Sequence, residues 1–308
     1  MNEIELPSES VMLDKFASDL SLEMLYSGRG IITLTSAGVD RPGLRLAGYF
    51  NYYDARRIIV IGLTEHDYLR GFSEEERREK IGRLFSRGQV PCVIFSRDLP
   101  VPPEFMDCAR ETGTPVFRSG KMTTMLMSDL VIYLARVLAP STAVHGVLMD
   151  VFGVGILLTG NSGVGKSETA MELIKRGHRL VADDSVVVKR VDKELIGSAP
   201  ERIRYFMELR GIGIINVKNM YGSGSILEEK TIELVMELEH WQQGKEYDRI
   251  GGENAHEAIL GVELPKLTIP VSPGRNLAIL IEVAARNFRL KSMGYDASQE
   301  LILRTIGR

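Results

Sequence analysis

A complete phosphate-binding loop is the feature of this sequence that most constrains its fold. Residues 160–167 read Gly-Asn-Ser-Gly-Val-Gly-Lys-Ser and match the pattern G-x-x-x-x-G-K-[ST] at each fixed position. The loop follows the apolar run Val154 to Thr159 and precedes Glu168 to Lys175, which has helical composition and spacing. This order of strand, loop and helix predicts a phosphate site at the amino end of the helix, where backbone N–H groups and the helix dipole favour anions.

Every residue of this loop is a candidate ligand for a nucleotide or polyphosphate. Its glycines let the backbone turn sharply and point N–H groups at phosphate oxygens. Lys166 is expected to contact the outer phosphates, and the Ser167 hydroxyl is expected to bind Mg²⁺. The full set of candidate ligands is Gly160, Asn161, Ser162, Gly163, Val164, Gly165, Lys166 and Ser167.

Length and composition favour two globular domains. A chain of 308 residues, 44% of them hydrophobic, exceeds one comfortable core and can bury two. The net charge of −3 and the lack of a basic tract argue against binding of nucleic acid along an extended surface. Apolar stretches are too short to span a membrane, and the acidic start, Met1 to Glu5, lacks a signal-peptide pattern. We therefore expect a cytoplasmic protein whose Cys92 and Cys108 stay reduced and buried.

The first part of the chain, residues 1–132, is predicted to form an α/β domain of unassigned role. Ser73 followed by three acidic residues predicts the start of a helix that reaches Phe85. A further helix is expected from Thr123 to Leu138, and Pro140 ends it. Short apolar runs predict buried parallel strands at 30–34, 58–63, 91–95 and 114–117.

The second part, residues 133–308, carries an acidic pair soon after the loop. A predicted strand, 179–182, ends in Asp183 and Asp184, and residues 185–190 are expected to continue it. Two carboxylates at a strand end are placed to hold Mg²⁺ through water or to accept a proton, and a solvated turn is the alternative. Which one is the base depends on the register, because adjacent strand residues point to opposite faces; we favour Asp184.

Other charged residues lie around the loop strand and farther along the chain. Glu208 can provide a Mg²⁺ ligand and Arg210 a phosphate contact, or the two form a surface ion pair. Arg249 stands beside glycines, where it can neutralise a transferring phosphoryl group or remain solvated. His145 is either catalytic or structural. A stiff loop suited to an anion or a partner protein consists of Pro270, Val271, Ser272, Pro273, Gly274 and Arg275.

In this order, the segments resemble the HPr kinase/phosphorylase family of bacteria over nearly the whole chain. The resemblance includes an amino-domain segment, Arg41 to Phe50, as well as the loop, the acidic pair and the Glu208 to Val217 segment. The sequence departs from the family pattern at Asn161, where aspartate is common. It is also less typical in the stretch 251–256.

The resemblance implies an amino-terminal α/β domain followed by a P-loop kinase domain similar to the phosphoenolpyruvate carboxykinase type. It implies a bifunctional enzyme that uses ATP or pyrophosphate to phosphorylate a serine of the phosphocarrier protein HPr. With inorganic phosphate, such an enzyme removes the group again and releases pyrophosphate. The implied setting is carbon catabolite control, and the implied assembly is a homohexamer.

Residue roles also follow from the resemblance. The family's catalytic positions correspond to His145, Lys166, Asp183, Asp184 and Arg249. Its Mg²⁺ ligands correspond to Ser167 and Glu208, and its dephosphorylation loop corresponds to Pro270 to Arg275. An aspartate of the pair would accept the serine proton in one direction and return it in the other. Two other functions remain compatible with the loop: a small-molecule or carboxykinase-like kinase, and a nucleotide-sensing switch.

Overall fold

The computed structural model describes residues 4–5, 11–30, 32–86, 88–245, 247, 255–272 and 274–306. The chain divides into two compact units, Ser8–Ala139 and a second unit made of Met1–Pro7 and Pro140–Arg308. The boundary expected after residue 132 falls inside helix α6 (Thr123–Val137). Leu130 and Leu134 of this helix lie in the core of the first unit, so the unit continues to the end of the helix.

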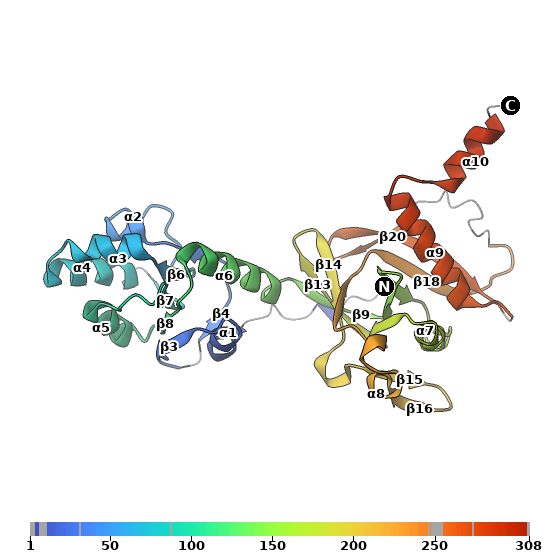
Figure 1. Ribbon diagram of the computed structural model, residues 1–308, viewed down its shortest axis with the longest axis horizontal. Helices are drawn as coiled ribbons and strands as arrows, with labels where there is room; N and C mark the ends of the chain where they lie inside the picture. The colour runs from blue at the N-terminus through green and yellow to red at the C-terminus, as the bar shows by residue number, and fades with distance from the viewer. Residues whose placement is uncertain are drawn as a thin grey trace. The chain divides into compact units, whose positions relative to one another are not determined.

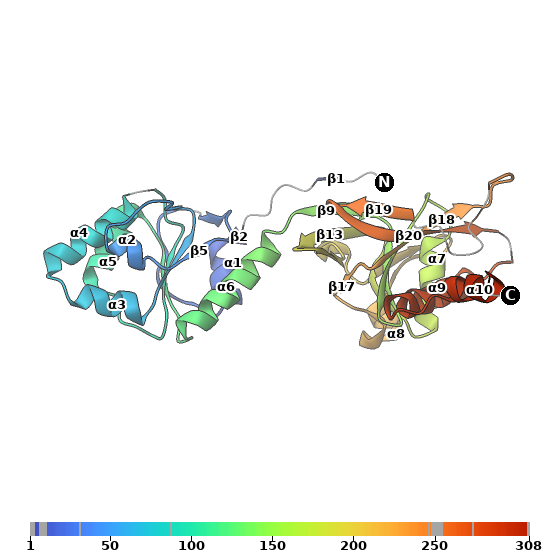
Figure 2. The same cartoon turned by 90° about the horizontal axis from the view of Figure 1, so that it is seen from above.

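The first unit is a sheet covered by helices on both faces. Its strands are β3 (Glu23–Tyr26), β5 (Val39–Asp40), β6 (Ile58–Ile61), β7 (Val93–Phe95) and β8 (Val116–Arg118). They lie in the order β3-β8-β7-β6-β5, with all neighbours parallel except β3 and β8. Its other helices are α1 (Leu13–Asp19), α2 (Gly43–Leu46), α3 (Leu63–Arg70), α4 (Glu74–Phe85) and α5 (Pro103–Thr112). Alternate residues of β6 pack against α1 and α6 on one face and against α2 to α5 on the other (Figures 1 and 2).

Most local predictions for this unit are confirmed. Three of the four predicted strands form β6, β7 and β8 of the sheet. The prediction of a parallel strand at 30–34 is wrong: among the described residues of this segment, Thr33–Leu34 form β4, which pairs antiparallel with β2 (Val11–Met12) in a separate ribbon. The reason is that Leu34 is buried and Thr33 exposed, whereas β6 buries all four of its residues. Ser73 caps α4 as predicted, since its hydroxyl accepts a hydrogen bond from the Glu76 N–H.

The second unit contains two packed sheets and a hairpin. The larger sheet, in spatial order, consists of β12 (Arg179–Ala182), β10 (Val147–Val151), β11 (Val154–Thr159), β18 (Leu234–His240), β20 (Val262–Val271) and β19 (Ala255–Ile259). The smaller one consists of β1 (Ile4–Glu5), β9 (Ser141–His145), β13 (Ser185–Val191), β14 (Glu194–Ser198) and β17 (Glu229–Thr231). The hairpin joins β15 (Phe206–Leu209) to β16 (Gly213–Asn216). The helices are α7 (Lys166–Lys175), α8 (Val217–Tyr221), α9 (Leu277–Ser292) and α10 (Ala297–Ile306).

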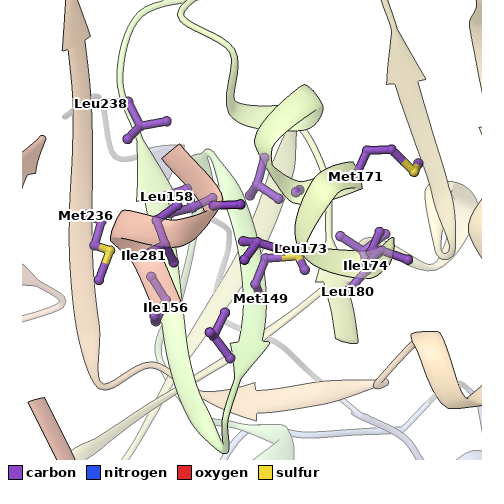
Figure 3. Close-up of a cluster of buried hydrophobic side chains, with 14 of the residues drawn as sticks. Met149, Ile156, Leu158, Met171, Leu173, Ile174, Leu180, Met236, Leu238 and Ile281 are labelled. Atoms are coloured by element: carbon purple, nitrogen blue, oxygen red, sulfur yellow. The ribbon is translucent and has the colours of Figure 1, made fainter. Parts of the chain in front are cut away.

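The larger sheet is the middle layer of this unit. On one face, Leu158 of β11 and Met236 of β18 pack against Leu173 of α7 and Ile281 of α9 (Figure 3). On the other face, Leu157 of β11 belongs to a second core shared with the smaller sheet. Because side chains alternate along a strand, β11 is buried on both faces and cannot move without disturbing two cores. In the part of the chain that the structure describes, no helix is long and apolar enough to cross a membrane.

Two crossings between the sheets lie side by side. The chain passes from β9 to β10 through Gly146, and from β12 to β13 through Asp183 and Asp184. The N–H of Gly146 donates to the Asp184 carbonyl across 3.1 Å, which ties the two crossings together. Residues 185–190 therefore do not continue the preceding strand, contrary to expectation. Asp184 has a φ of 66°, in the left-handed region, and this turn sends β13 into the other sheet.

Candidate active site

The phosphate-binding loop connects the central strand to a helix, as the sequence predicts. It leaves β11 at Thr159 and enters α7 at Lys166. Gly160 has a φ of 128°, and a Cβ atom there would lie 2.1 Å from the carbonyl oxygen of Leu238. Only glycine is compatible with both the backbone conformation and this close approach. The loop is thereby held against β18 at its first residue.

Lys166 lies under the loop rather than in solvent. Its side chain is 7% exposed, and its ammonium donates hydrogen bonds to the carbonyls of Gly160 at 2.8 Å and Asn161 at 3.2 Å. Burial lowers the pKa of Lys166, against the opposing effect of the carboxylates of Asp184, Asp183 and Glu168. A bound phosphate would offer this ammonium stronger, charged acceptors than two carbonyls. The lysine is therefore positioned to respond to an anion in the loop.

Asp183 is the buried member of the acidic pair. One of its oxygens accepts a hydrogen bond from the Ser167 hydroxyl at 2.8 Å, and the other accepts one from the Glu208 N–H at 3.2 Å. The residue is 5% exposed, and burial raises its pKa above the usual aspartate range. Asp183 therefore connects α7 to β15.

Asp184 is the accessible member. Its side chain is 71% exposed, and Oδ1 lies 3.2 Å from Nδ1 of His145, whose own side chain is 55% exposed. His145 ends β9, next to the Gly146 N–H that holds the Asp184 carbonyl. The carboxylate is thus fixed at its base and open at its tip. Asp184 can reach a hydroxyl that enters the pocket, which is what a general base requires.

The hairpin supplies the opposite wall of the pocket. Glu208 lies on β15, and Arg210 follows it and donates to the Ser162 hydroxyl at 3.2 Å. The pocket has a volume of about 130 Å³. It is lined by His145, Val147, Ser162, Gly163, Gly165, Lys166, Ser167, Glu168, Asp183, Asp184, Glu208 and Arg210. Val147 and Glu168 were not predicted: neither belongs to a recognisable pattern, although Glu168 directly follows the loop.

The oxygen atoms in this pocket suit a magnesium ion. Ser167, Asp183 and Glu208 all line the pocket, and hydroxyl and carboxylate oxygens are ligands that Mg²⁺ accepts. Among the described residues, no three His, Cys, Asp or Glu side chains form a ready-made metal cage. Mg²⁺ does not require such a cage, because it usually keeps several waters and takes few protein ligands beside the phosphates.

Two residues of the predicted dephosphorylation loop do not line this pocket. Pro270 and Arg275 line a different hollow, beside α9, and the Arg275 guanidinium donates to the Pro270 carbonyl at 3.3 Å. Arg249 and Pro273 lie outside the described residues. The structure therefore groups the loop, His145, the acidic pair and Glu208, and leaves Pro270 and Arg275 apart from them.

Comparisons with known proteins match both halves of the chain. The family description HPr Serine kinase N terminus matches residues 11–134, and HPr Serine kinase C-terminal domain matches residues 136–305. The HPr kinase/phosphorylase of Bacillus licheniformis is 51% identical over 291 residues, which cover 94% of this chain and 92% of that protein. That of Bacillus subtilis is 49% identical over 282 residues, or 91% of each. A solved structure of the Hpr(Ser) kinase/phosphatase from Coxiella burnetii has 36% sequence identity and a TM-score of 0.48, covering 52% of this chain and 97% of that one.

Proposed function

The chain belongs to the HPr serine kinase family, and from this premise we propose that it phosphorylates a serine of the protein HPr and removes the phosphate again by phosphorolysis. The observation that carries the proposal is the different placement of two consecutive carboxylates beside one phosphate loop. Asp183 is buried on the Ser167 hydroxyl, and Asp184 is exposed beside His145. Asp183 can orient the metal ligand Ser167, and Asp184 can accept and return the serine proton.

In the kinase direction, Asp184 accepts the proton of the substrate serine. A serine hydroxyl is a weak nucleophile until that proton leaves, so a carboxylate within reach lowers the barrier to its attack on the terminal phosphorus. Lys166 and the loop N–H groups hold the outer phosphates in line with the serine oxygen. When bound, Mg²⁺ would neutralise phosphate charge, with Ser167 and Glu208 as its protein ligands and Asp183 orienting Ser167.

In the phosphorylase direction, the same groups act in reverse. An oxygen of inorganic phosphate attacks the phosphorus of phosphoserine, and the bond from phosphorus to the serine oxygen breaks. Protonated Asp184 gives its proton to the departing serine oxygen, so that serine and pyrophosphate are released. Microscopic reversibility allows one carboxyl group both roles.

A nucleotide phosphoryl donor follows from the kinase family. We propose ATP or pyrophosphate as the phosphoryl donor, Mg²⁺ as the metal and inorganic phosphate as the acceptor in reverse. A loop that grips the terminal phosphates does not need the nucleoside, which supports pyrophosphate as a donor. Arg249 is proposed to neutralise the transferring group, and the Pro270 to Arg275 loop to assist dephosphorylation.

We also propose that the protein is a cytoplasmic homohexamer. A homohexamer would cover apolar side chains such as Leu301 and Leu303 of α10, which are exposed in the single chain. A cytoplasmic location is supported by Cys92 and Cys108, which are unpaired and buried, since thiols remain reduced in that compartment. Sedimentation of the purified protein tests the assembly.

One labelling experiment tests the function. The protein is incubated with Mg²⁺ and ATP labelled in the terminal phosphate, with and without purified HPr, and inorganic phosphate is then added. We expect label on an HPr serine, followed by its loss as labelled pyrophosphate. Label on a small metabolite alone would indicate a metabolite kinase instead, and nucleotide binding without transfer would indicate a regulatory switch.

A further inference from the structure

A second hollow lies against the first residues of the phosphate loop. It has a volume of about 430 Å³ and shares His145 and Ser162 with the catalytic pocket, so these two residues stand between the two spaces. Its charged lining comes from three strands of the larger sheet: Glu237 of β18, Glu257 of β19 and Lys266 of β20. No role for these three residues follows from the proposed chemistry.

The three charged side chains form one connected cluster. The Lys266 ammonium lies 3.0 Å from a carboxylate oxygen of Glu237 and 2.9 Å from one of Glu257. Burial lowers the pKa of Lys266, but hydrogen bonds to Glu257 and Glu237 outweigh that effect and raise the pKa above the usual lysine range. The lysine thus stays charged, and its only neighbours in the lining with opposite charge are the two glutamates.

Among the residues that the structure describes, the cluster leaves an excess of negative charge. Two carboxylates face one ammonium, and the adjacent pair of Glu239 and Lys245, 2.7 Å apart, adds no net charge. His145 is the other titratable group in the lining. A polyphosphate would be repelled from this surface, whereas a lysine or arginine side chain would be attracted. The side of the hollow formed by Glu237, Glu257 and Lys266 therefore favours a cation over an anion.

The hollow also lies at the end of the loop where transfer takes place. The Lys166 ammonium hydrogen-bonds the carbonyls of Gly160 and Asn161, and both of these residues line the hollow. Because the loop lysine contacts the outer phosphates, the phosphate to be transferred lies toward this end. His145 lines both spaces and lies beside Asp184, so a serine that meets Asp184 in the pocket has the hollow next to it.

We propose that this hollow is the subsite for a positively charged side chain of the protein substrate, close to the acceptor serine. The proposal rests on the proposed function, since it assumes a protein acceptor. Glu257 and Glu237 bind the incoming cation, and Lys266 holds the two carboxylates together until it arrives. Charge pairing at this position would orient the serine toward Asp184.

Three variants of the full-length protein test this subsite by the sign of their effects. Glu257→Gln removes one carboxylate, so the KM for HPr is expected to rise about two- to fivefold, the size of a partly exposed charge pair, while the KM for ATP is unchanged. Lys266→Gln removes the competing cation, so the KM for HPr is expected to fall. Glu263→Gln, on the same strand but exposed and outside the hollow, is the matched control.

The outcomes separate the subsite from a structural role. If Glu257→Gln and Lys266→Gln both raise the KM for HPr, the cluster is a structural ion-pair network and the subsite is overturned. A change confined to the KM for ATP overturns it as well. Glu237→Gln must also raise the KM for HPr. This second variant keeps the test decisive if Glu257→Gln does not fold. Failure of the unsubstituted protein to label HPr overturns the proposed function and the subsite together, whereas labelling with unchanged KM values overturns the subsite alone.

Discussion

The Nδ1 atom of His145 lies 3.2 Å from Oδ1 of Asp184, at the point where two chain crossings meet between the sheets of the second unit. The backbone repeats this connection, because the Gly146 N–H donates to the Asp184 carbonyl. Both ends of the aspartate are therefore held by one neighbouring segment, while its carboxylate remains largely exposed. This is the arrangement expected of a base that must meet a hydroxyl on another protein.

Replacement of Asp184 by asparagine is expected to abolish both activities. The amide has the size of the carboxylate and tolerates the left-handed backbone of this position, so the fold should persist. It cannot accept the serine proton or return it, and we expect kinase and phosphorylase rates to fall by about a hundredfold or more. Both rates are measured with HPr and phosphorylated HPr on the same preparation.

Asp183→Asn is the matched control for this assignment. The variant keeps Asp184 and His145, and its main expected effect is a higher Mg²⁺ requirement, because Asp183 orients the Ser167 hydroxyl. Near-normal activity in Asp184→Asn together with loss in Asp183→Asn would reverse the two roles.

Lys166→Ala is expected to eliminate transfer from ATP and from pyrophosphate alike. Its ammonium lies under the loop, bonded to the Gly160 and Asn161 carbonyls, and its removal deletes the fixed charge on the outer phosphates. Pyrophosphate contains no nucleoside, so loss of transfer from both donors would show that Lys166 acts on the phosphates. Lys175→Ala, at the exposed end of the same helix, controls for general effects of a lost lysine and should retain transfer.

The raised pKa of Asp183 predicts a pH-dependent difference in stability. A carboxyl whose pKa is higher in the folded than in the unfolded protein costs stability once it ionises. That cost begins at about pH 4, where the aspartate titrates in the unfolded protein. It is complete above the raised pKa of Asp183 in the folded protein. Asp183→Asn has no such cost. The difference in melting temperature, variant minus unsubstituted protein, should therefore be larger at neutral pH than at about pH 4. A difference independent of pH would show that Asp183 ionises normally. Thermal unfolding without ligand at the two pH values measures it.

Local sequence patterns predicted the elements whose determinants are local. The phosphate loop is recognisable because its glycines, lysine and serine are neighbours in sequence, and α4 because Ser73 directly precedes its first turn. The roles within the acidic pair were not predictable in the same way. The left-handed turn at Asp184 interrupts the strand and sends the next segment to another sheet, so strand alternation does not apply there.

Long-range pairing explains what the sequence did not reveal. Glu237, Glu257 and Lys266 meet only because β18, β20 and β19 are neighbours in one sheet. Each is an ordinary charged residue in its own segment, and no local spacing marks it. The order of strands in a sheet depends on how whole layers pack, and this cannot be inferred from residues that are neighbours in sequence.

Arg275→Ala is expected to impair phosphorylase activity more than kinase activity. Arg275 is exposed, its guanidinium donates to the Pro270 carbonyl, and it does not line the pocket around the phosphate loop. Kinase chemistry relies on a phosphate already held by Lys166 as part of ATP. Inorganic phosphate must instead be captured as a free anion, which needs an additional cation. Loss of one charged hydrogen bond predicts roughly a tenfold greater fall in the phosphorylase rate.

The comparison requires both rates from the same preparation of Arg275→Ala, with phosphate varied in the reverse reaction. Most of the loss should appear as a higher KM for inorganic phosphate, because the proposed contact is made with the free anion before any bond changes. Arg202→Ala, another exposed arginine of the second unit, should leave both rates unchanged. Equal losses in the two directions would mean that Arg275 acts on the groups around the phosphate loop that both reactions use. That outcome would contradict the prediction, because Arg275 lines the hollow beside α9 instead. A selective loss of phosphorylase activity would instead give the segment after β20 a role in dephosphorylation. Lys266 of the same strand lines the hollow beside the phosphate loop.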